Sequence, residues 1–302
     1  MKFAYYPGCS AKSTCKELSV STRLVAGRLG LELTELESAS CTGSREIRAT
    51  NKELFLALNA RILALAEKDK LPLMTVCNTC TLNLLDTQKM LEEDPEVKDR
   101  INVELAKMGL SYKGTSRVTH FLWVLLEDVG EARLREKVVR PLNGLKLAAY
   151  YGCHIIRPPK HFGFFDSRNA RSIERLNEIL GCQSIDYTGR TECCGFHTAA
   201  DNEKVAIKLS GRHVKAAKDG GAHAMVTPCP LCHTVLDTFQ GQMERDLGTK
   251  LKMPILHLPQ LVGLALGMSA DELQLARHMV PVQLNINQSP SNVTDRTMFV
   301  PP

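Results

Sequence analysis

The second half of the chain contains Thr191-Glu192-Cys193-Cys194-Gly195-Phe196-His197. Adjacent cysteines rarely bond to each other, because a vicinal disulfide strains the peptide between them. They can instead both face one multinuclear metal cluster, and Gly195 leaves room where the backbone passes close to such a cluster. Cys153 lies upstream, and Cys229 and Cys232 lie downstream. These five cysteines predict an iron–sulfur site, and the rest of the chain is expected to be its scaffold.

The composition is that of a globular protein. The chain has 302 residues, of which 44% are hydrophobic and 24% are charged. This length suits one large domain or two modest ones. The formal net charge is +5, with basic and acidic residues interspersed, so a nucleic-acid partner is not expected.

No targeting or membrane segment is predicted. Residues 1 to 7 indicate a strand and a turn, because no long apolar run follows Lys2 as it would in a signal peptide. No stretch approaches the roughly 18 uninterrupted apolar residues of a membrane helix. We therefore expect a cytoplasmic protein, in which the 11 cysteines are ligands or catalytic groups rather than disulfides.

The cysteine motifs occur twice. Cys41-Thr42-Gly43 corresponds to Cys193-Cys194-Gly195, and Cys77-x-x-Cys80 corresponds to Cys229-x-x-Cys232, each pair at the same offset of 152 residues. Cys9 corresponds to Cys153 at an offset of 144, so the second half has about eight extra residues. We place them within residues 155 to 169. Identical offsets predict an internal duplication.

Each half alternates strands and helices, which predicts an α/β fold of two similar lobes with parallel sheets flanked by helices. Expected strands are 2–6, 31–36 and 71–76, then 145–150, 183–187 and 223–226. Expected helices are 18–29, 51–67 and 79–91, then 170–180, 202–218 and 231–242.

The predicted domains are residues 1–143, 144–279 and 280–302. The first ends in a helical connector that includes 118–126 and 131–138, followed by a linker at 141–144. The second ends in a helix at 257–266 and a capping box at Ser269-Ala270-Asp271-Glu272. The third is an extended arm, which is either a disordered tail or a strap over a neighbouring subunit.

A C-x-x-C pair at a strand-to-helix junction has three usual meanings: a redox dithiol, a zinc ligand pair or an iron–sulfur ligand pair. Helix N-terminal N–H groups favour thiolates in all three. Zinc takes four ligands, and the second half offers five cysteines, which favours an iron–sulfur cluster there.

The second-half pattern resembles the cysteine-rich CCG domain, which is duplicated in the B subunit of heterodisulfide reductase and in related proteins. The resemblance covers residues 1 to 268. It implies that Cys153, Cys193, Cys194, Cys229 and Cys232 bind a non-cubane [4Fe-4S] cluster, which forms or cleaves disulfides by binding sulfur at iron. The expected α/β fold places the clusters at the carboxyl ends of the strands, where such sheets have their sites.

The first half departs from this pattern because Thr42 replaces the second cysteine of the pair. Cys9, Cys41, Cys77 and Cys80 are expected to hold a second iron–sulfur cluster or a zinc ion, and an empty site remains an alternative. We favour a saturated electron-transfer centre, with an open cluster as the alternative. Cys15 and Cys182 lie outside both patterns and are interpreted as structural thiols.

Several histidines and basic residues lie near the motifs. His154 and His197 are candidate catalytic proton donors to a leaving thiolate. The alternative for them, and for His233, is hydrogen bonding to sulfur or an ordinary surface position. Arg157 and Lys160 are either substrate-carboxylate ligands or solvated loop charges.

The resemblance implies thiol–disulfide redox chemistry within a complex. The degenerate Cys41-Thr42-Gly43 motif is most similar to the B subunit of sulfur-oxidising heterodisulfide-reductase-like complexes. Implied partners are a C-type ferredoxin-like subunit, an A-type flavoprotein and a lipoate-binding carrier protein. The methanogen protein and a membrane-associated succinate or fumarate dehydrogenase subunit rank next. A non-catalytic electron-transfer or zinc-stabilised assembly subunit is the rival from another class.

Overall fold

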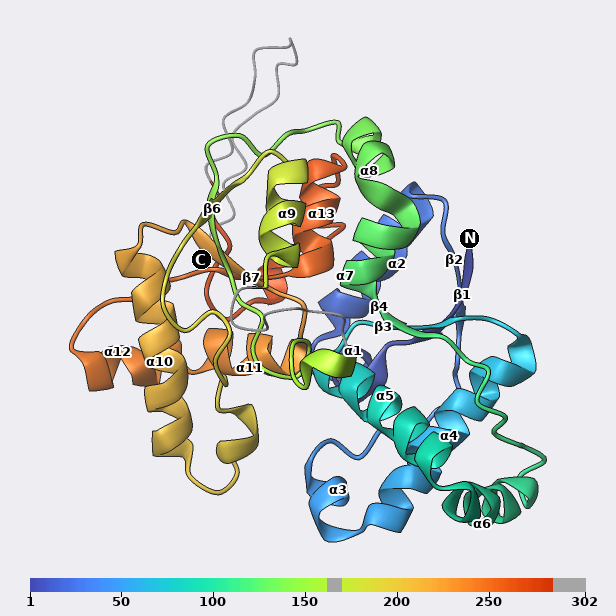
Figure 1. Cartoon of the computed structure of the whole chain (residues 1–302). Coiled ribbons are helices and arrows are strands. Elements are labelled where there is room, and N and C mark those ends of the chain that lie inside the picture. Colours follow the sequence, from blue (N-terminus) through green and yellow to red (C-terminus); the bar gives the residue numbers. More distant parts are fainter. Residues whose placement is uncertain (162–169, 285–302) are drawn as a thin grey trace.

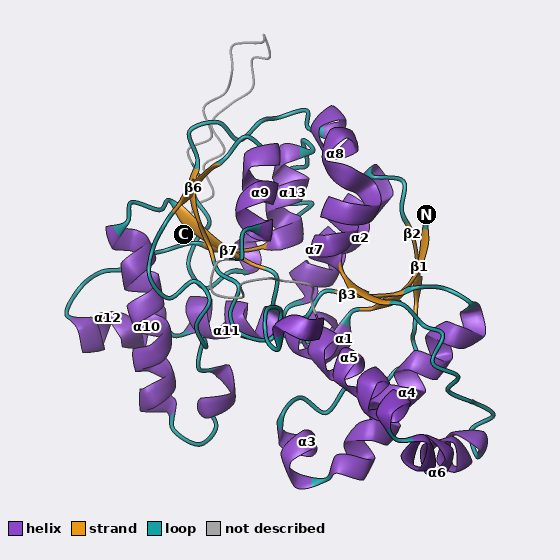
Figure 2. Ribbon diagram, viewed as in Figure 1, coloured by secondary structure: helices purple, strands orange, loops and turns teal. Residues whose placement is uncertain are grey.

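Two parallel sheets of four strands form the frame of the protein, as the computed structural model of residues 1–161 and 170–284 shows (Figure 2). Each sheet belongs to one half of the chain, so the predicted α/β fold is confirmed. The first sheet has the order β2 (Glu32–Glu35), β1 (Lys2–Tyr6), β3 (Leu73–Thr75), β4 (Val118–His120). The second has the order β6 (Gln183–Ile185), β5 (Lys146–Ala149), β7 (Ala224–Thr227), β8 (Ile255–His257).

The strand register repeats between the sheets. Ala4 of β1 lies opposite Leu73 of β3, and the equivalent Ala148 of β5 lies opposite Met225 of β7. The central strands are buried, as expected for parallel strands with helices on both faces. The duplication seen in the cysteine motifs therefore extends to the backbone pairing.

Helices cover both sheets and connect the two lobes (Figure 1). Asparagine side chains cap the N-termini of two of these helices. Asn51 accepts a hydrogen bond from Leu54 N at the start of α4, and Asn202 accepts one from Val205 N at the start of α10. The first lobe contains α1 (Gly8–Lys12), α2 (Lys16–Arg28), α3 (Glu46–Thr50), α4 (Lys52–Asp69), α5 (Asn78–Glu93) and α6 (Pro95–Ala106). The connector contains α7 (Phe121–Trp123), the π-helix η1 (Val124–Gly130) and α8 (Glu131–Lys137). The second lobe contains η2 (Pro159–His161), α9 (Ser172–Ile179), η4 (Phe196–Thr198), α10 (Glu203–Asp219), α11 (Pro230–Thr238), α12 (Gln240–Leu247), α13 (Leu258–Ala265) and η5 (Leu275–Arg277).

Four sequence predictions need correction. The segment 118–126 begins as strand β4, and 257–266 begins at the end of strand β8, so each sheet has one strand more than predicted. The segment 231–242 is divided at Phe239 into α11 and α12. Ser269 and Glu272 do form the reciprocal bonds of a capping box, but turns and the short η5 follow. Strands β4 and β8 have three residues each, which is too short to show an alternating pattern.

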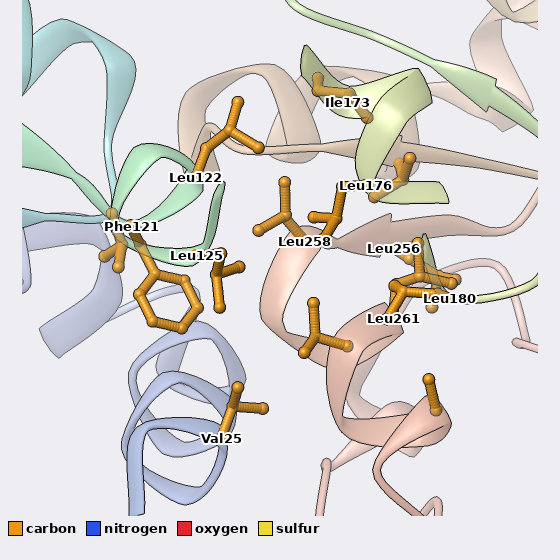
Figure 3. Close-up of a cluster of buried hydrophobic side chains, with 14 of the residues drawn as sticks. Val25, Phe121, Leu122, Leu125, Ile173, Leu176, Leu180, Leu256, Leu258 and Leu261 are labelled. Atoms are coloured by element: carbon orange, nitrogen blue, oxygen red, sulfur yellow. The ribbon is translucent and has the colours of Figure 1, made fainter. Parts of the chain in front are cut away.

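The two lobes share one hydrophobic core (Figure 3). Val25 of α2 lies on one side of it, and Ile173 and Leu176 of α9 lie on the other. Leu125 of η1 and Leu261 of α13 lie between them. These side chains come from both halves of the chain, so the cluster packs the two lobes against each other.

The predicted domain boundary at residue 143 lies between α8 and β5. The predicted arm begins at Val280, whose N–H, like that of Met279, donates to the Asp237 carboxylate. Most of the arm, residues 285–302, lies outside the described residues, as do residues 162–169 of the predicted insertion. Among the helices that the structure describes, none is both long and apolar enough to span a membrane.

Candidate functional site

All nine motif cysteines follow the carboxyl ends of strands. Cys9 follows β1, Cys41 follows β2, and Cys77 and Cys80 lie between β3 and the first turn of α5. The second lobe repeats this arrangement after β5, β6 and β7. Parallel α/β sheets place their sites at this edge. The fold therefore gathers each set of cysteines into one region, as the resemblance implies.

The second-lobe cysteines differ in burial. Cys194, Cys229 and Cys232 are buried, whereas Cys153 is partly exposed and Cys193 is exposed. Cys193 Sγ accepts a hydrogen bond from Gly195 N over 3.4 Å. Two thiols of the set therefore reach solvent while three are enclosed.

Gly152 makes this packing possible. Its φ is +67°, and a Cβ atom added there would lie 2.8 Å from Cys232 Sγ. That distance is shorter than any real contact, and the positive φ is itself unfavourable for a residue with a side chain. Gly8 is the equivalent residue of the first lobe. Its φ is +79°, and a Cβ atom added there would lie 3.3 Å from Cys80 Sγ.

The thiols of the second lobe influence one another's ionisation. The pKa of Cys193 is lowered by hydrogen bonds with Cys153 and Cys194, and the pKa of Cys153 is raised, first by its bond to Cys193 and then by burial. Such close groups cannot all be thiolates unless a cation neutralises them. Thiolates suit zinc and iron–sulfur clusters, and five of them exceed the four that zinc takes. This donor set therefore fits an iron–sulfur cluster.

The first lobe contains a smaller version of the site. Cys9 Sγ lies 3.7 Å from Cys41 Sγ, and Gly43 N donates to Cys41 Sγ over 3.4 Å. The hydrogen bond with Cys41 lowers the pKa of Cys9 to about 6. The cavity beside these thiols is about 40 Å³, and Pro230 and Leu231 of the other lobe help to line it, while Cys9 and Cys41 are exposed. Four thiols fit either a zinc ion or an iron–sulfur cluster.

Thr42 faces this first-lobe cavity. It is 1% exposed, and its hydroxyl donates to Cys80 Sγ at 3.6 Å. Asn83 Nδ2 donates back to the Thr42 hydroxyl over 3.3 Å. In the other lobe, Cys194 hydrogen-bonds the equivalent Cys232. Thr42 therefore occupies the place of Cys194.

The two sites meet across the lobe interface. Cys77 of the first lobe hydrogen-bonds Cys229 of the second, and Asn78 Nδ2 donates to Tyr151 O over 2.9 Å. Figure 1 shows α1, α5 and α11 converging at this interface. The two cysteine sites therefore adjoin each other at the lobe interface.

A cleft of about 880 Å³ opens beside the second-lobe site. Cys153 and Cys193 line it, together with Arg157 from the same lobe and Arg45 and Arg48 from the other. Arg48 is paired with Asp86, and Arg157 donates to Thr191 O. The basic groups favour an anionic ligand. The side chain of Lys160, the other predicted substrate ligand, lies outside the described part of the chain.

His154 lines the cleft, and its ring centroid is 5.5 Å from that of His197. Its Nδ1 lies 2.8 Å from Thr79 Oγ1, whereas His197 Nδ1 lies 3.0 Å from Glu46 Oε1. Burial lowers the pKa of His154 to about 4. The structure thus brings both predicted histidines together, whereas the third, His233, is buried away from the cleft against His257.

Sequence reasoning missed the groups that hold the site in place. Tyr150 Oη donates to Glu192 O over 3.0 Å and so anchors the loop before Cys193, and Tyr6 Oη does the same to Ser40 O over 2.8 Å. A tyrosine stands shortly before the first cysteine of each half, but a tyrosine at the end of a buried strand also fits ordinary packing, so the sequence alone does not reveal this role. Thr79 and Glu46, the partners of the two histidines, carried no recognisable signal.

Comparison with known proteins identifies the family. The model of the cysteine-rich domain, CCG, matches residues 3–85 and 147–237, and the chain belongs to this family, which confirms the predicted duplication of the domain. Membership supports an iron–sulfur redox subunit.

Relatives extend over almost the whole chain. The 8-methylmenaquinol:fumarate reductase membrane anchor subunit of Wolinella succinogenes is 43% identical over 279 residues, which cover 92% of this chain and 97% of that protein. The B subunit of the ferredoxin/F(420)H(2)-dependent CoB-CoM heterodisulfide reductase of Methanosarcina acetivorans is 32% identical, covering 92% and 94%. The crystal structure of a hypothetical protein from Helicobacter pylori has a TM-score of 0.73 at 17% identity, covering 93% of this chain and 52% of that one, and shows the shared fold alone.

Proposed function

We propose that the chain is an oxidoreductase subunit that performs thiol–disulfide chemistry at its second-lobe cysteine site. One observation carries this proposal: Cys153 and Cys193 open onto a basic cleft of about 880 Å³, whereas the first-lobe cavity is about 40 Å³. A sulfur substrate therefore has room to bind beside the second site, whereas the first site has exposed thiols but only a small cavity beside them. The first site would serve electron transfer.

Cys153, Cys193, Cys194, Cys229 and Cys232 would hold a non-cubane [4Fe-4S] cluster. Such a cluster would supply electrons and an iron that accepts a sulfur ligand. Cys9, Cys41, Cys77 and Cys80 would hold the second cluster, or zinc. Arg45 and Arg157 would bind the anionic groups of the substrate, because guanidinium groups pair with carboxylates.

His154, which burial keeps neutral, would donate a hydrogen bond to the departing sulfur, and His197, which faces Glu46, would provide the proton. Their position beside Cys153 and the cleft supports this role. Thr79 and Glu46 would orient the two rings through their Nδ1 atoms, leaving Nε2 for the substrate.

The complex would include further subunits, because the relatives are themselves subunits of reductases. Ferredoxin-like C-type and flavoprotein A-type subunits would connect this chain to its electron source, since the sequence has no Rossmann glycine fingerprint and no P-loop. In a sulfur-oxidising version of the complex, a lipoate-binding protein would carry the substrate sulfur in the cytoplasm.

A second candidate function follows from the 43% identity to the fumarate reductase subunit, which exceeds the 32% identity to heterodisulfide reductase. In that complex the chain would pass electrons between a quinol and a fumarate-reducing partner. Any membrane association would use a surface or another subunit rather than a described helix.

The test is activity of the anaerobically purified complex with two substrate pairs. Reduced viologen with a lipoamide or mixed disulfide measures sulfur chemistry, and a naphthoquinol with fumarate measures the second candidate. Cys193→Ser should remove at least 90% of the disulfide activity and change the EPR spectrum. Cys182→Ser is the matched control, because Cys182 is a buried thiol, with a pKa raised by burial to about 12, outside both sites.

Full disulfide activity in Cys193→Ser would refute the proposed site. Fumarate reduction without any disulfide reduction would support the second candidate. Iron-free protein that contains only zinc would support a non-catalytic assembly subunit.

A further inference from the structure

A group of metal-binding side chains lies outside both cysteine motifs. Cys15, Glu17, His233 and His257 each offer one ligand atom, and these atoms all lie within 4.8 Å of one another. All four residues are at most 4% exposed. Cys15 and Glu17 begin α2 of the first lobe, whereas His233 lies in α11 and His257 ends β8 of the second lobe. The group therefore bridges the two lobes.

We propose that these four residues form a structural zinc site that joins the lobes. Zinc accepts sulfur, imidazole nitrogen and carboxylate oxygen in a tetrahedral set of four, and structural sites are closed to solvent. The charges of a Cys15 thiolate and a Glu17 carboxylate would balance a divalent cation in this buried location. The proposal is independent of the proposed redox function.

The surrounding hydrogen bonds prepare the two imidazoles. His233 Nε2 lies 2.9 Å from Ile255 O, and a ring N–H that donates to a carbonyl leaves the other ring nitrogen available to a metal. His257 Nε2 lies 3.1 Å from Glu17 Oε1, and its Nδ1 is buried with no hydrogen-bond partner among the described residues. A zinc ion bound by His257 Nε2 and Glu17 Oε1 would take the place of the proton that these two atoms share in the metal-free protein.

Cys15 is suited to act as the sulfur ligand. It occupies the N-cap of α2, and its Sγ lies within 4.8 Å of the ligand atoms of the other three residues. Arg277 Nε donates to Glu17 Oε2 over 3.0 Å, which orients the carboxylate and leaves Oε1 toward His257. This accounts for Cys15, which belongs to neither cysteine motif.

A neighbouring group, His233, Asp237 and His278, also converges within 4.8 Å. The Asp237 oxygens already accept Met279 N at 2.7 Å and Val280 N at 3.1 Å. His278 Nε2 lies 3.0 Å from Gln260 Oε1. These residues therefore fasten the segment that follows η5, and the first group is the better metal site.

The decisive measurement is anomalous diffraction from crystals of the full-length protein produced with zinc. Data collected above and below the zinc absorption edge should give a peak among Cys15, Glu17, His233 and His257. Zinc X-ray absorption should show one sulfur and three nitrogen or oxygen ligands, unlike the sulfur-only shell of zinc in the first-lobe cysteine site.

Variants identify the ligand. Cys15→Ser should lose about one zinc ion per chain and keep its iron content, whereas Cys182→Ser should keep both. Cys41→Ser should leave this zinc in place. Absence of the anomalous peak in the wild-type crystal would overturn the proposal even if Cys15→Ser failed to fold. In that case His257 and Glu17 would form an ion pair without a metal ion.

Discussion

Thr42 and Cys194 occupy equivalent positions in the two lobes, and the difference between a hydroxyl and a thiol distinguishes the two sites. A threonine hydroxyl is a weak ligand for iron beside thiolates. In the structure it hydrogen-bonds Cys80 instead, at 3.6 Å. The replacement of one cysteine by Thr42 therefore leaves four thiols in the first lobe, against five in the second.

Replacing Thr42 by Cys should add a fifth sulfur ligand to the first site. Because Thr42 is buried and faces the cavity, the new thiol would meet Cys80 as Cys194 meets Cys232. We expect a changed EPR spectrum of the purified protein, with disulfide activity still dependent on Cys193. Thr42→Ser, which keeps the hydroxyl, is the control. A Thr42→Cys spectrum and metal content identical to those of the control would show that the position contributes no ligand.

At the scale of elements, each cysteine set depends on a tight turn between a central strand and the following helix. Gly152 and Gly8 lie in the left-handed region just after β5 and β1, and the sulfurs of Cys232 and Cys80 pack against them. The strands and the C-x-x-C helices are brought together only because these turns lack a side chain.

Gly152→Ala should destabilise the second site. Its Cβ would lie 2.8 Å from Cys232 Sγ, so the thiol must move. Gly221→Ala is a matched control, because Gly221 has φ +83° but no atom within 4 Å of an added Cβ. Both variants should lose about 1–2 kcal/mol of stability to backbone strain, measurable by urea unfolding. Only Gly152→Ala should also lose half or more of its iron, and equal iron contents in the two variants would contradict this explanation.

At the scale of the whole molecule, buried polar contacts and a common core hold the lobes together. His120, which ends β4, accepts Leu122 N at Nδ1 over 3.0 Å and places Nε2 3.1 Å from Pro228 O of the other lobe. The neutral ring therefore satisfies both contacts. Burial lowers the pKa of His120 to about 4 from its ordinary value of 6.5.

This depressed pKa predicts a loss of stability in acid. Above pH 6.5 the imidazole is neutral in the folded and the unfolded chain. As the pH falls from 6.5 to about 4, the unfolded chain binds a proton that the folded chain excludes. The free energy of unfolding should therefore fall, by up to about 3 kcal/mol from this group.

Urea unfolding between about pH 7 and pH 4 measures this contribution. His120→Asn removes the titration, so its stability should fall less steeply with acid than that of the wild type, whatever its stability at neutral pH. If the free energy of unfolding fell equally with acid in the two proteins, His120 would carry the same charge in the folded and the unfolded chain, and the explanation would be wrong.

The amino-acid sequence by itself determined the family, the duplication and the location of nine cysteines at strand ends. These features follow from identical spacing and from local strand and helix signals, which need no long-range information. The sequence did not predict β4 and β8, because each strand runs directly into a helix and has only three residues, which is too short for a strand pattern to be recognised. Tertiary structure alone placed Thr79 beside His154, Glu46 beside His197 and Cys15 beside His257, since each pair joins residues from different lobes. Contacts between halves depend on how the lobes dock, and no local pattern records that.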